Sequence, residues 1–360
     1  MSYSDDDFFV LSSSCQITRG YNRSLIQDFE RNVSNIISNE YYDLIKEIDR
    51  ARISDSLKII DEDSHIFFRK FLDFMFDSEY ALFVDNIDFF PIKSDELNDE
   101  HVILKDCIIE IDKSNFDTKI FESNLDQLNK LSCEDIQIWL ISESDKPFVK
   151  KILDIASSYD FLCIELSITN SNNFDRTFLI SLLEDYACVS KIFLFDSEKS
   201  TIYDYIKDDE GYYPLLIGQL IYVGHPLNAN SCGIINFENL SFGVEHQFSV
   251  NKKFNGCLYK KLAIDSQGNL KNCPHLEQSF GKQNISEVLK KPLFQKKWLI
   301  KKDDIKVCQD CEFRYNCTDC RAFITSEHDD LSKPLKCGYN PYTNVWESWS
   351  DKSILKQEVN

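Results

Sequence analysis

The sequence predicts an α/β protein built around a partial (β/α) barrel, with a small α+β unit before it and a cysteine-rich domain after it. Apolar strand-like and helix-like segments alternate between residues 96 and 230. That alternation is typical of right-handed βαβ units around a mostly parallel sheet. Short strand-like runs followed by helical spacing fill residues 1–95, and eight of the 13 cysteines crowd into residues 232–337.

The N-terminal unit, residues 1–95, is expected to begin with three short strands in FFVLSSS, CQITRG and SLIQDF, with a turn at 19–22. A helix follows in SNIISNEYYDLIKEIDRA, where apolar residues recur at helical spacing from Ile36 onward and Ser34 or Asn35 is the expected N-cap. A second helix in SHIFFRKFLDFMFDSEY and a strand in ALFVDN complete the unit.

The middle of the chain, residues 96–230, is expected to hold about five strands, in VILKDCIIEI, DIQIWLIS, FLCIELSIT, KIFLFDS and PLLIGQLIYVG. Three helices lie between the first four of them. A closed barrel needs eight strands and roughly 200 residues, so this region supplies a partial barrel or an open sheet. Glycine, asparagine and cysteine become frequent near residue 231, which indicates a third domain at 231–360.

The composition excludes some functions. A formal net charge of -20 argues against nucleic-acid binding, which needs lysine and arginine to displace counterions from phosphates. The acidic surface serves solubility or favours a basic partner. No stretch approaches the roughly 18 apolar residues that span a membrane, and MSYSDDDFFV does not resemble a signal peptide. We therefore expect a cytoplasmic protein with no membrane or nucleic-acid partner.

The cysteines divide into two sets. Five before residue 231 are widely spaced and are expected to be core thiols. In a reducing cytosol the other eight indicate metal binding rather than disulfides. The central motif, Cys308 to Cys320, has the spacing C-x2-C-x5-C-x2-C. Each two-residue gap lets two thiolates on one tight turn reach the same metal or cluster corner, and the four negative charges require a metal to compensate them.

A second cysteine pair lies upstream. Cys257 and Cys273 flank a predicted hairpin whose turn, Asp265 to Asn269, contains Gly268. Residues in this turn tolerate positive φ, so the chain can reverse and bring the two cysteines onto neighbouring strands.

In this order the motifs C-x10-G-x4-C, C-x2-C-x5-C-x2-C and a final Cys337 resemble the SPASM domain of radical SAM enzymes that mature peptides. The resemblance covers about 232–349 and implies two auxiliary [4Fe–4S] clusters. It implies that one cluster is held by Cys308, Cys311, Cys317 and Cys337, and the other by Cys257, Cys273 and Cys320. This sequence has two residues, Thr318 and Asp319, where the SPASM pattern usually has three.

The fourth ligand of the cluster at Cys257 and Cys273 stays open. Cys232 is the nearest candidate, although it stands 25 positions before Cys257. The alternative is an iron site left open for a substrate group. Structural zinc competes with iron–sulfur clusters for all eight cysteines, because paired C-x2-C units also suit zinc sites with four cysteine ligands.

The chain lacks the C-x3-C-x2-C loop with which radical SAM enzymes hold their catalytic cluster, so we expect no SAM cleavage and assign no catalytic residue. A SPASM-like domain without that cluster, carrying CEFRYNCTDCR and KPLKCGYNPY, is similar to the peptide maturases of grasp-with-spasm systems. The resemblance implies an accessory maturase that binds a ribosomal precursor peptide and works with an ATP-grasp ligase that forms side-chain crosslinks. The alternatives are a zinc-stapled adaptor and a cluster-based electron-transfer partner.

The N-terminal unit resembles the winged-helix modules that bind leader peptides by adding the peptide as a strand to a sheet edge. The resemblance implies that its third strand, with Leu25 and Ile26, and its second helix, with Phe68 and Phe71, contact the precursor. The competing interpretation is that these phenylalanines fill a core, as apolar residues at helical spacing usually do.

Overall fold

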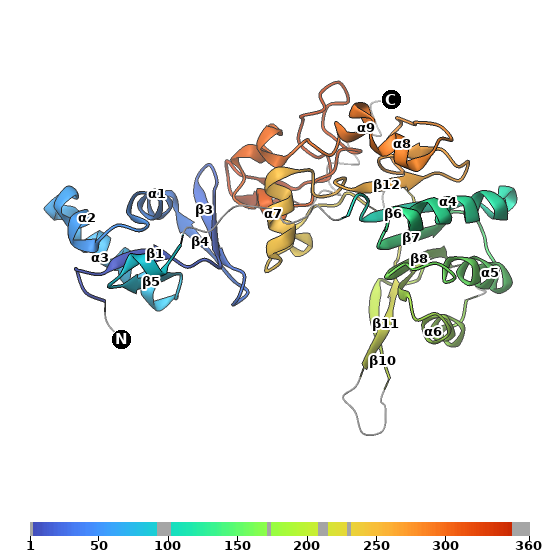
Figure 1. The fold of residues 1–360 in the computed structure, drawn as a ribbon, viewed down its shortest axis with the longest axis horizontal. Coiled ribbons are helices and arrows are strands. Elements are labelled where there is room, and N and C mark those ends of the chain that lie inside the picture. Colours follow the sequence, from blue (N-terminus) through green and yellow to red (C-terminus); the bar gives the residue numbers. More distant parts are fainter. Residues whose placement is uncertain (1–2, 92–101, 171–173, 208–214, 229–231, 348–360) are drawn as a thin grey trace.

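The computed structural model describes residues 3–91, 102–170, 174–207, 215–228 and 232–347. The chain is drawn out into an arch (Figure 1): the N-terminal unit forms one end, the cysteine-rich region lies in the middle, and a large sheet with its helices forms the other end. None of the helices in the described part of the chain has both the length and the apolar character needed to cross a bilayer.

The N-terminal unit holds two small antiparallel sheets and three helices. One sheet has the order β2-β3-β4 and the other pairs β1 with β5. Their bounds are β1 Phe8–Leu11, β2 Cys15–Arg19, β3 Arg23–Asp28, β4 Val33–Ser38 and β5 Ala81–Val84. The helices are α1 Asn39–Ile48, α2 Ile53–Ile59 and α3 His65–Asp77. Phe9, Ile26, Ile45, Phe71 and Met75 pack into the core that these elements share.

The helix expected from Ser34 or Asn35 begins later. Residues Val33–Ser38 form strand β4, and α1 starts at Asn39, where the Ser38 side chain accepts a hydrogen bond from Tyr41 N. The β-branched residues Val33, Ile36 and Ile37 favour the strand, and pairing with β3 fixes it. Helix α2 was not expected from the sequence.

The central sheet has eight strands in the order β10-β11-β9-β8-β7-β6-β12-β13. The strands are β6 Asp106–Ile111, β7 Asp135–Leu140, β8 Cys163–Thr169, β9 Val189–Phe195, β10 Thr201–Lys207, β11 Leu215–Tyr222, β12 Lys261–Ile264 and β13 Leu270–Lys271. All contacts from β11 to β12 are parallel, and only the two end pairs are antiparallel. The result is a mixed α/β fold with a mostly parallel sheet, consistent with a partial barrel.

Three helices cover one face of this sheet: α4 Thr118–Lys130, α5 Lys146–Ala156 and α6 Arg176–Asp185 (Figure 1). Aspartates at 117, 145 and 175 cap them, each side chain accepting from backbone amides of the first turn. Alternate strand residues, among them Ile109, Ile138, Leu166 and Ile192, pack beneath the helices in the largest core. These helices and five of the strands match the sequence predictions.

Two features of the sheet were not expected. Strand β10 pairs with β11 as an antiparallel edge. At the other end β12, from the predicted cysteine-rich domain, pairs with β6, so the sheet continues across the predicted boundary at 230/231. The hairpin β12–β13 forms, with Gly268 at φ +86° in its turn, but its strands are shorter than expected: Cys257 lies before β12 and Cys273 after β13 rather than on the strands.

The remainder of the cysteine-rich region is largely irregular. It contains helices α7 Glu245–Lys253, α8 Ile285–Leu289 and α9 Pro292–Gln295, and the two-residue strands β14 Tyr339–Asn340 and β15 Val345–Trp346. A small core of Ile235, Leu240, Phe313 and Tyr339 also includes Cys317 and, from the N-terminal unit, Leu25.

Candidate metal centre

One group of cysteines surrounds an internal cavity. Cys232, Cys257, Cys273 and Cys320 all line a cavity of about 110 Å³. The group contains the three residues that the SPASM resemblance implied for one cluster, and it places Cys232 beside them. Local contacts hold the chain in shape here: the Asn255 side chain accepts hydrogen bonds from the amides of Cys257 and Leu258.

Gly233 provides the close approach that this cavity requires. Its φ is +78°, and a Cβ placed on it would lie 2.9 Å from the sulfur of Cys320. A side chain at this position would be strained and would press on a thiol of the group.

The second group consists of Cys308, Cys311, Cys317 and Cys337. Negative charge on Cys317 and Cys337 raises the pKa of Cys308, and negative charge on Cys308 and Cys317 raises the pKa of Cys311, in addition to the larger effect of burial. Cys308 begins a short turn of 3-10 helix, and Phe313 N donates a hydrogen bond to the Cys311 sulfur at 3.4 Å. Cys337 joins through a parallel bridge to Ile235. These four are the residues that the resemblance implied for the other cluster.

Burial makes these thiols costly to ionise. It raises the pKa values of Cys232, Cys257 and Cys308 to about 12, with the charges of neighbouring thiols adding to the shift. Without compensation the thiols therefore keep their protons at neutral pH. Binding a metal or cluster would replace those protons with positive charge.

Two lysines supply part of that positive charge. Lys261, at the start of β12, is paired with Asp106 at 3.1 Å and interacts with the charges of Cys257 and Cys273. Lys302 Nζ lies 4.0 Å from the Cys308 sulfur, with only 4% of its side chain exposed. Each cysteine group thus has an ammonium beside it, buried for Lys302 and half-buried for Lys261, which the sequence pattern alone did not reveal.

The shortened gap before Cys320 holds a buried ion-pair centre. Asp319, at φ +75°, accepts hydrogen bonds from Lys302 at 2.9 Å, from Arg321 and from Asn255 at 2.7 Å. The two cations hold the pKa of Asp319 below its usual value although burial raises it. Asp319 therefore anchors the turn between Cys317, in one group, and Cys320, in the other.

The donor chemistry fits iron–sulfur clusters. A [4Fe–4S] cluster binds each of its four cysteines to a different iron, so it needs thiols arranged around a space rather than in mutual contact. The first group lines such a space. Among the described residues, no three histidine, cysteine, aspartate or glutamate side chains are grouped as they would be around a single metal ion.

The N-terminal unit packs directly on the second cysteine group. Arg23 Nε donates to Glu312 Oε1 at 2.6 Å, Asn316 Nδ2 donates to Gln27 Oε1 at 2.8 Å, and Tyr21 N donates to Asp310 O at 2.8 Å. The residues between Cys311 and Cys317 thus hold the β2–β3 hairpin as well as separating two cysteines.

The four residues expected to contact a peptide are all in the interior. Leu25, Ile26, Phe68 and Phe71 are at most 2% exposed. Strand β3 is the centre of its sheet, with β2 on one side and β4 on the other. Its side chains alternate between two cores, Ile26 facing the N-terminal unit and Leu25 the cysteine-rich region. In the described residues the two edges of this sheet belong to β2 and β4, and α1 packs against both strands.

Comparisons with known proteins give no close relative. No protein-family profile and no curated protein matches the chain. Streptococcus suis SuiB bound to S-adenosylmethionine is similar at 11% identity and a TM-score of 0.36, over 91% of this chain and 99% of that one. SuiB bound to its precursor peptide SuiA is similar at 9% identity and a TM-score of 0.30, over 91% and 98%. Similarity at this level assigns neither the family nor the function of the chain.

Proposed function

We propose that this protein is a cytoplasmic maturation factor for a ribosomally made, side-chain-crosslinked peptide. It holds two [4Fe–4S] clusters in its C-terminal region, binds the precursor through its N-terminal unit, and works with an ATP-grasp ligase of the grasp-with-spasm type. The ligase forms the crosslinks, and this protein presents the precursor to it.

The observation that carries the proposal is the division of the eight C-terminal cysteines into two groups of four. The SPASM resemblance implied seven of these ligands from sequence order alone. The cavity lined by Cys232, Cys257, Cys273 and Cys320, and the effect of charges within the set Cys308, Cys311, Cys317 and Cys337 on the pKa values of Cys308, Cys311 and Cys337, support the same two sets. Cys232 is then the fourth ligand of the first cluster. Clusters of this kind supply either one-electron chemistry or a structural crosslink.

The precursor would bind to the edge of β4 rather than to β3. Val33 and Ile36 on this strand are 46% and 42% exposed, an unusual amount for apolar residues on a sheet edge. Tyr41, in the first turn of α1, packs its ring against Phe67 and Phe71, so α3 lies against α1, the helix that follows β4 and contacts that strand. A leader peptide could add a strand to β4 and place apolar side chains against the helix.

Binding of a candidate precursor peptide by the full-length protein tests the proposal. We expect the double variant Val33→Asp/Ile36→Asp to weaken binding about tenfold or more, because each aspartate interrupts the apolar edge. Ile59→Asp is the matched control, since Ile59 on α2 is 77% exposed. Equal binding by the double variant and the control would remove β4 as the precursor site.

Zinc is the competing occupant of the cysteine groups. A zinc-stapled adaptor would be colourless and redox-inactive, whereas the cluster protein would be brown. A third alternative, an electron-transfer partner, would undergo reversible reduction without binding the precursor.

A further inference from the structure

The central sheet has two very different faces. Helices α4, α5 and α6 cover one face, and the residues beneath them form the apolar core. Along β7 every second residue is fully buried on that side, while Asp135, Gln137 and Trp139 on the other side are only half-buried. The second face, here called the inner face, therefore remains accessible to solvent.

Strand register places polar side chains in rows across the inner face. One row runs from Lys261 through Asp106 and Asp135 to Cys163 on four adjacent parallel strands. The next row contains Gln137, Glu165, Lys191, Gln219 and Asp204, from β7 to β10. The pairing of β8 with β9 shifts between Ile164 and Glu165, and on either side of that shift the paired side chains lie next to one another on the same face.

The charge of this surface is predominantly negative. Among the described strand residues, the inner face carries five carboxylates and three lysines: Asp106, Glu110, Asp135, Glu165 and Asp204, with Lys191, Lys261 and Lys271. Burial and the charge of Asp106 raise the pKa of Asp135, and burial raises that of Glu110. A cation binding near these two groups would relieve that cost.

One cavity opens on this surface, and another lies beyond the carboxyl ends of two of its strands. The first, of about 180 Å³, is lined by Asp106, Asp135, Gln137, Cys163, Glu165 and Lys261. In this cavity Lys261 Nζ lies 3.1 Å from the Oδ1 atom of Asp106 and forms an ion pair with it. The first cavity is wide enough for a side chain but is below the 300 Å³ or so of a typical small-molecule site.

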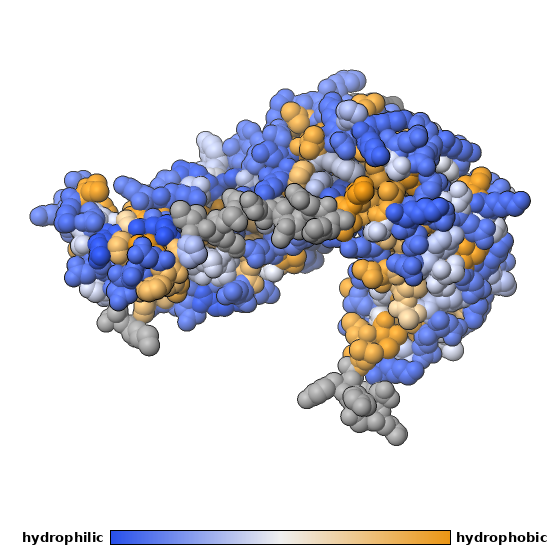
Figure 2. Space-filling model, viewed as in Figure 1, coloured by the Kyte–Doolittle hydropathy of each residue, from blue (hydrophilic) through white to orange (hydrophobic). Residues whose placement is uncertain are grey.

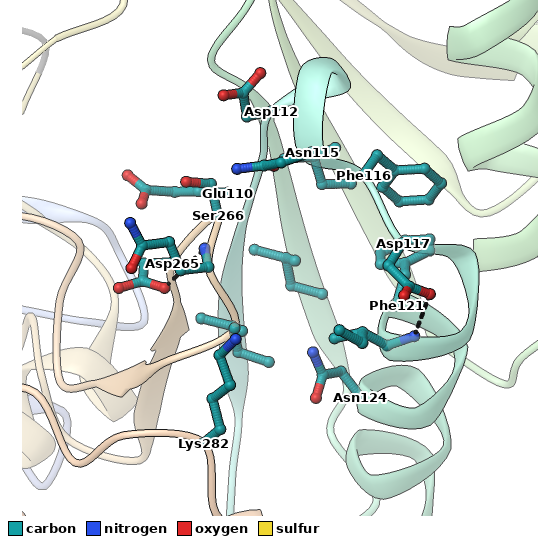
Figure 3. Close-up of a pocket in the computed structure, with 16 residues that line it drawn as sticks. Glu110, Asp112, Asn115, Phe116, Asp117, Phe121, Asn124, Asp265, Ser266 and Lys282 are labelled. Atoms are coloured by element: carbon teal, nitrogen blue, oxygen red, sulfur yellow. Dashed lines mark hydrogen bonds between the residues drawn. The ribbon is translucent and has the colours of Figure 1, made fainter.

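The second cavity, of about 280 Å³, lies at the carboxyl ends of β6 and β12, where Glu110 ends its row. Figure 3 shows Asp117, Phe121 and Asn124 of α4 on one side of this cavity and Asp265 and Ser266 on the other. Because α4 covers the opposite face of the sheet, this cavity lies beside the inner face rather than on it, and Glu110 is the inner-face residue that lines it.

The surface also has apolar positions suited to an extended chain. At the β10 end, Ile202 and Ile206 are 66% and 52% exposed, and Figure 2 shows apolar residues gathered on this hairpin. Near the other end Trp139 lies 5.9 Å from the ring of His275, two residues after Cys273. The inner face thus runs from an exposed apolar hairpin to the edge of the first cysteine group.

The position of the inner face also favours a peptide. In Figure 2 the arch is hollowed beneath its middle, and the sheet borders this hollow opposite the N-terminal unit. A chain held at the N-terminal unit could cross the hollow and reach the sheet.

We propose that the inner face of the central sheet binds a basic, extended segment of a peptide, with cationic side chains toward the carboxylates of the Asp135 and Glu165 rows and aliphatic side chains toward the β10–β11 hairpin. The inference rests on the proposed function in that this segment belongs to the precursor. The charge and strand register of the inner face do not depend on the cysteine groups or on β4.

The test uses a short fluorescein-labelled peptide in which lysine alternates with valine, and its glutamate–valine counterpart, by fluorescence anisotropy on the full-length protein. The variant Asp135→Asn/Glu165→Gln removes two inner-face carboxylates. Its matched control is Asp126→Asn/Glu122→Gln on α4, beyond the opposite face. In both variants one acid of the pair is bonded to a lysine, Glu165 to Lys191 and Asp126 to Lys130.

We expect the lysine peptide to bind in a salt-sensitive manner and the glutamate peptide not to bind. Asp135→Asn/Glu165→Gln should weaken binding about tenfold, and the control should leave it unchanged. Lys191→Glu, at a side chain 40% exposed, should tighten it. Circular dichroism establishes that each variant is folded.

Equal affinity of Asp135→Asn/Glu165→Gln and the α4 control would overturn the inference, as would unchanged affinity in Lys191→Glu. Loss of precursor binding in Val33→Asp/Ile36→Asp with these results would retain the proposed function and reject only the inner face. If the lysine peptide binds at the inner face while Val33→Asp/Ile36→Asp leaves precursor binding unchanged, the inner face is retained and the proposed function at β4 is rejected.

Discussion

Arg23 Nε donates a hydrogen bond to Glu312 Oε1 at 2.6 Å, and this ion pair joins the N-terminal unit to the C-x5-C segment of the cysteine motif. The Glu312 side chain is 1% exposed, against 30% for Arg23. Tyr339 also donates to Glu312. A carboxylate buried to this extent is stable only while its partners remain, so the two regions depend on each other.

Replacing Arg23 by methionine should destabilise the protein by about 2 kcal/mol, because a buried carboxylate loses a charged donor and keeps only the Tyr339 hydroxyl. Urea unfolding of the as-purified protein measures this. Arg23→Met/Glu312→Gln should recover part of the loss, since the uncompensated charge is gone. If the double variant were less stable than Arg23→Met, the pair would not be the source of the effect.

The ion-pair centre at Asp319 predicts a larger effect. Asp319→Asn leaves Lys302 and Arg321 buried at 4% and 1% side-chain exposure without a counter-charge, which should cost about 3–5 kcal/mol. The control is Asp329→Asn, whose partner Lys306 is 71% exposed. There the loss should stay below about 1 kcal/mol. Similar losses in the two variants would contradict a structural role for the short gap before Cys320.

Gly233 allows a test directed at the first cysteine group. Gly233→Ala introduces a Cβ 2.9 Å from the Cys320 sulfur and should lower the metal content of that group, leaving the second group loaded. Gly281→Ala separates this effect from backbone strain, because Gly281 also has a positive φ, +68°, but nothing lies within 4 Å of an added Cβ. The metal-to-protein ratio should fall only in Gly233→Ala.

Helix α3 predicts a contrast between two phenylalanines. Phe71 is fully buried and Phe67 is 42% exposed. Phe71→Ala should therefore cost about 3–5 kcal/mol of stability through loss of packing, whereas Phe67→Ala should cost about 1 kcal/mol or less. Thermal unfolding of both variants measures the difference. A stable Phe71→Ala protein would place this residue at a surface, as a direct peptide contact requires.

The sequence predicted the local elements of the sheet well and its ends poorly. Strands β6 to β9 are rich in apolar residues, and helices α4 to α6 carry apolar residues at helical spacing. Each of these helices also begins after a capping aspartate. Strand β4 was mistaken for the start of a helix because Ile36 and Ile37 continue the helical spacing of α1, although their β-branching and Ser38 as a cap favoured the observed boundary. Strand β12 joins the sheet through a contact between Lys261 and Asp106, far apart in the chain, which no local pattern reveals.

For the candidate site, cysteine spacing indicated the grouping, but the supporting residues needed the fold. Lys302 stands six residues before Cys308, and Asp319 directly precedes Cys320. From sequence alone, an aspartate between two cysteines is usually interpreted as an exposed loop residue. Its burial became apparent only from the contacts with Arg321 and Asn255. The buried state of Leu25 and Ile26 likewise depends on a second core that the hairpin meets in the cysteine-rich region.

The most direct test of the account is the content of iron and acid-labile sulfide per chain in protein purified without oxygen. The account predicts about eight of each for two [4Fe–4S] clusters. It predicts about four in Cys257→Ala and in Cys308→Ala, and about eight in the control Cys163→Ala, which changes a thiol of β8 outside both groups. Stoichiometric zinc with no iron, or undiminished iron in both cysteine-group variants, would contradict it.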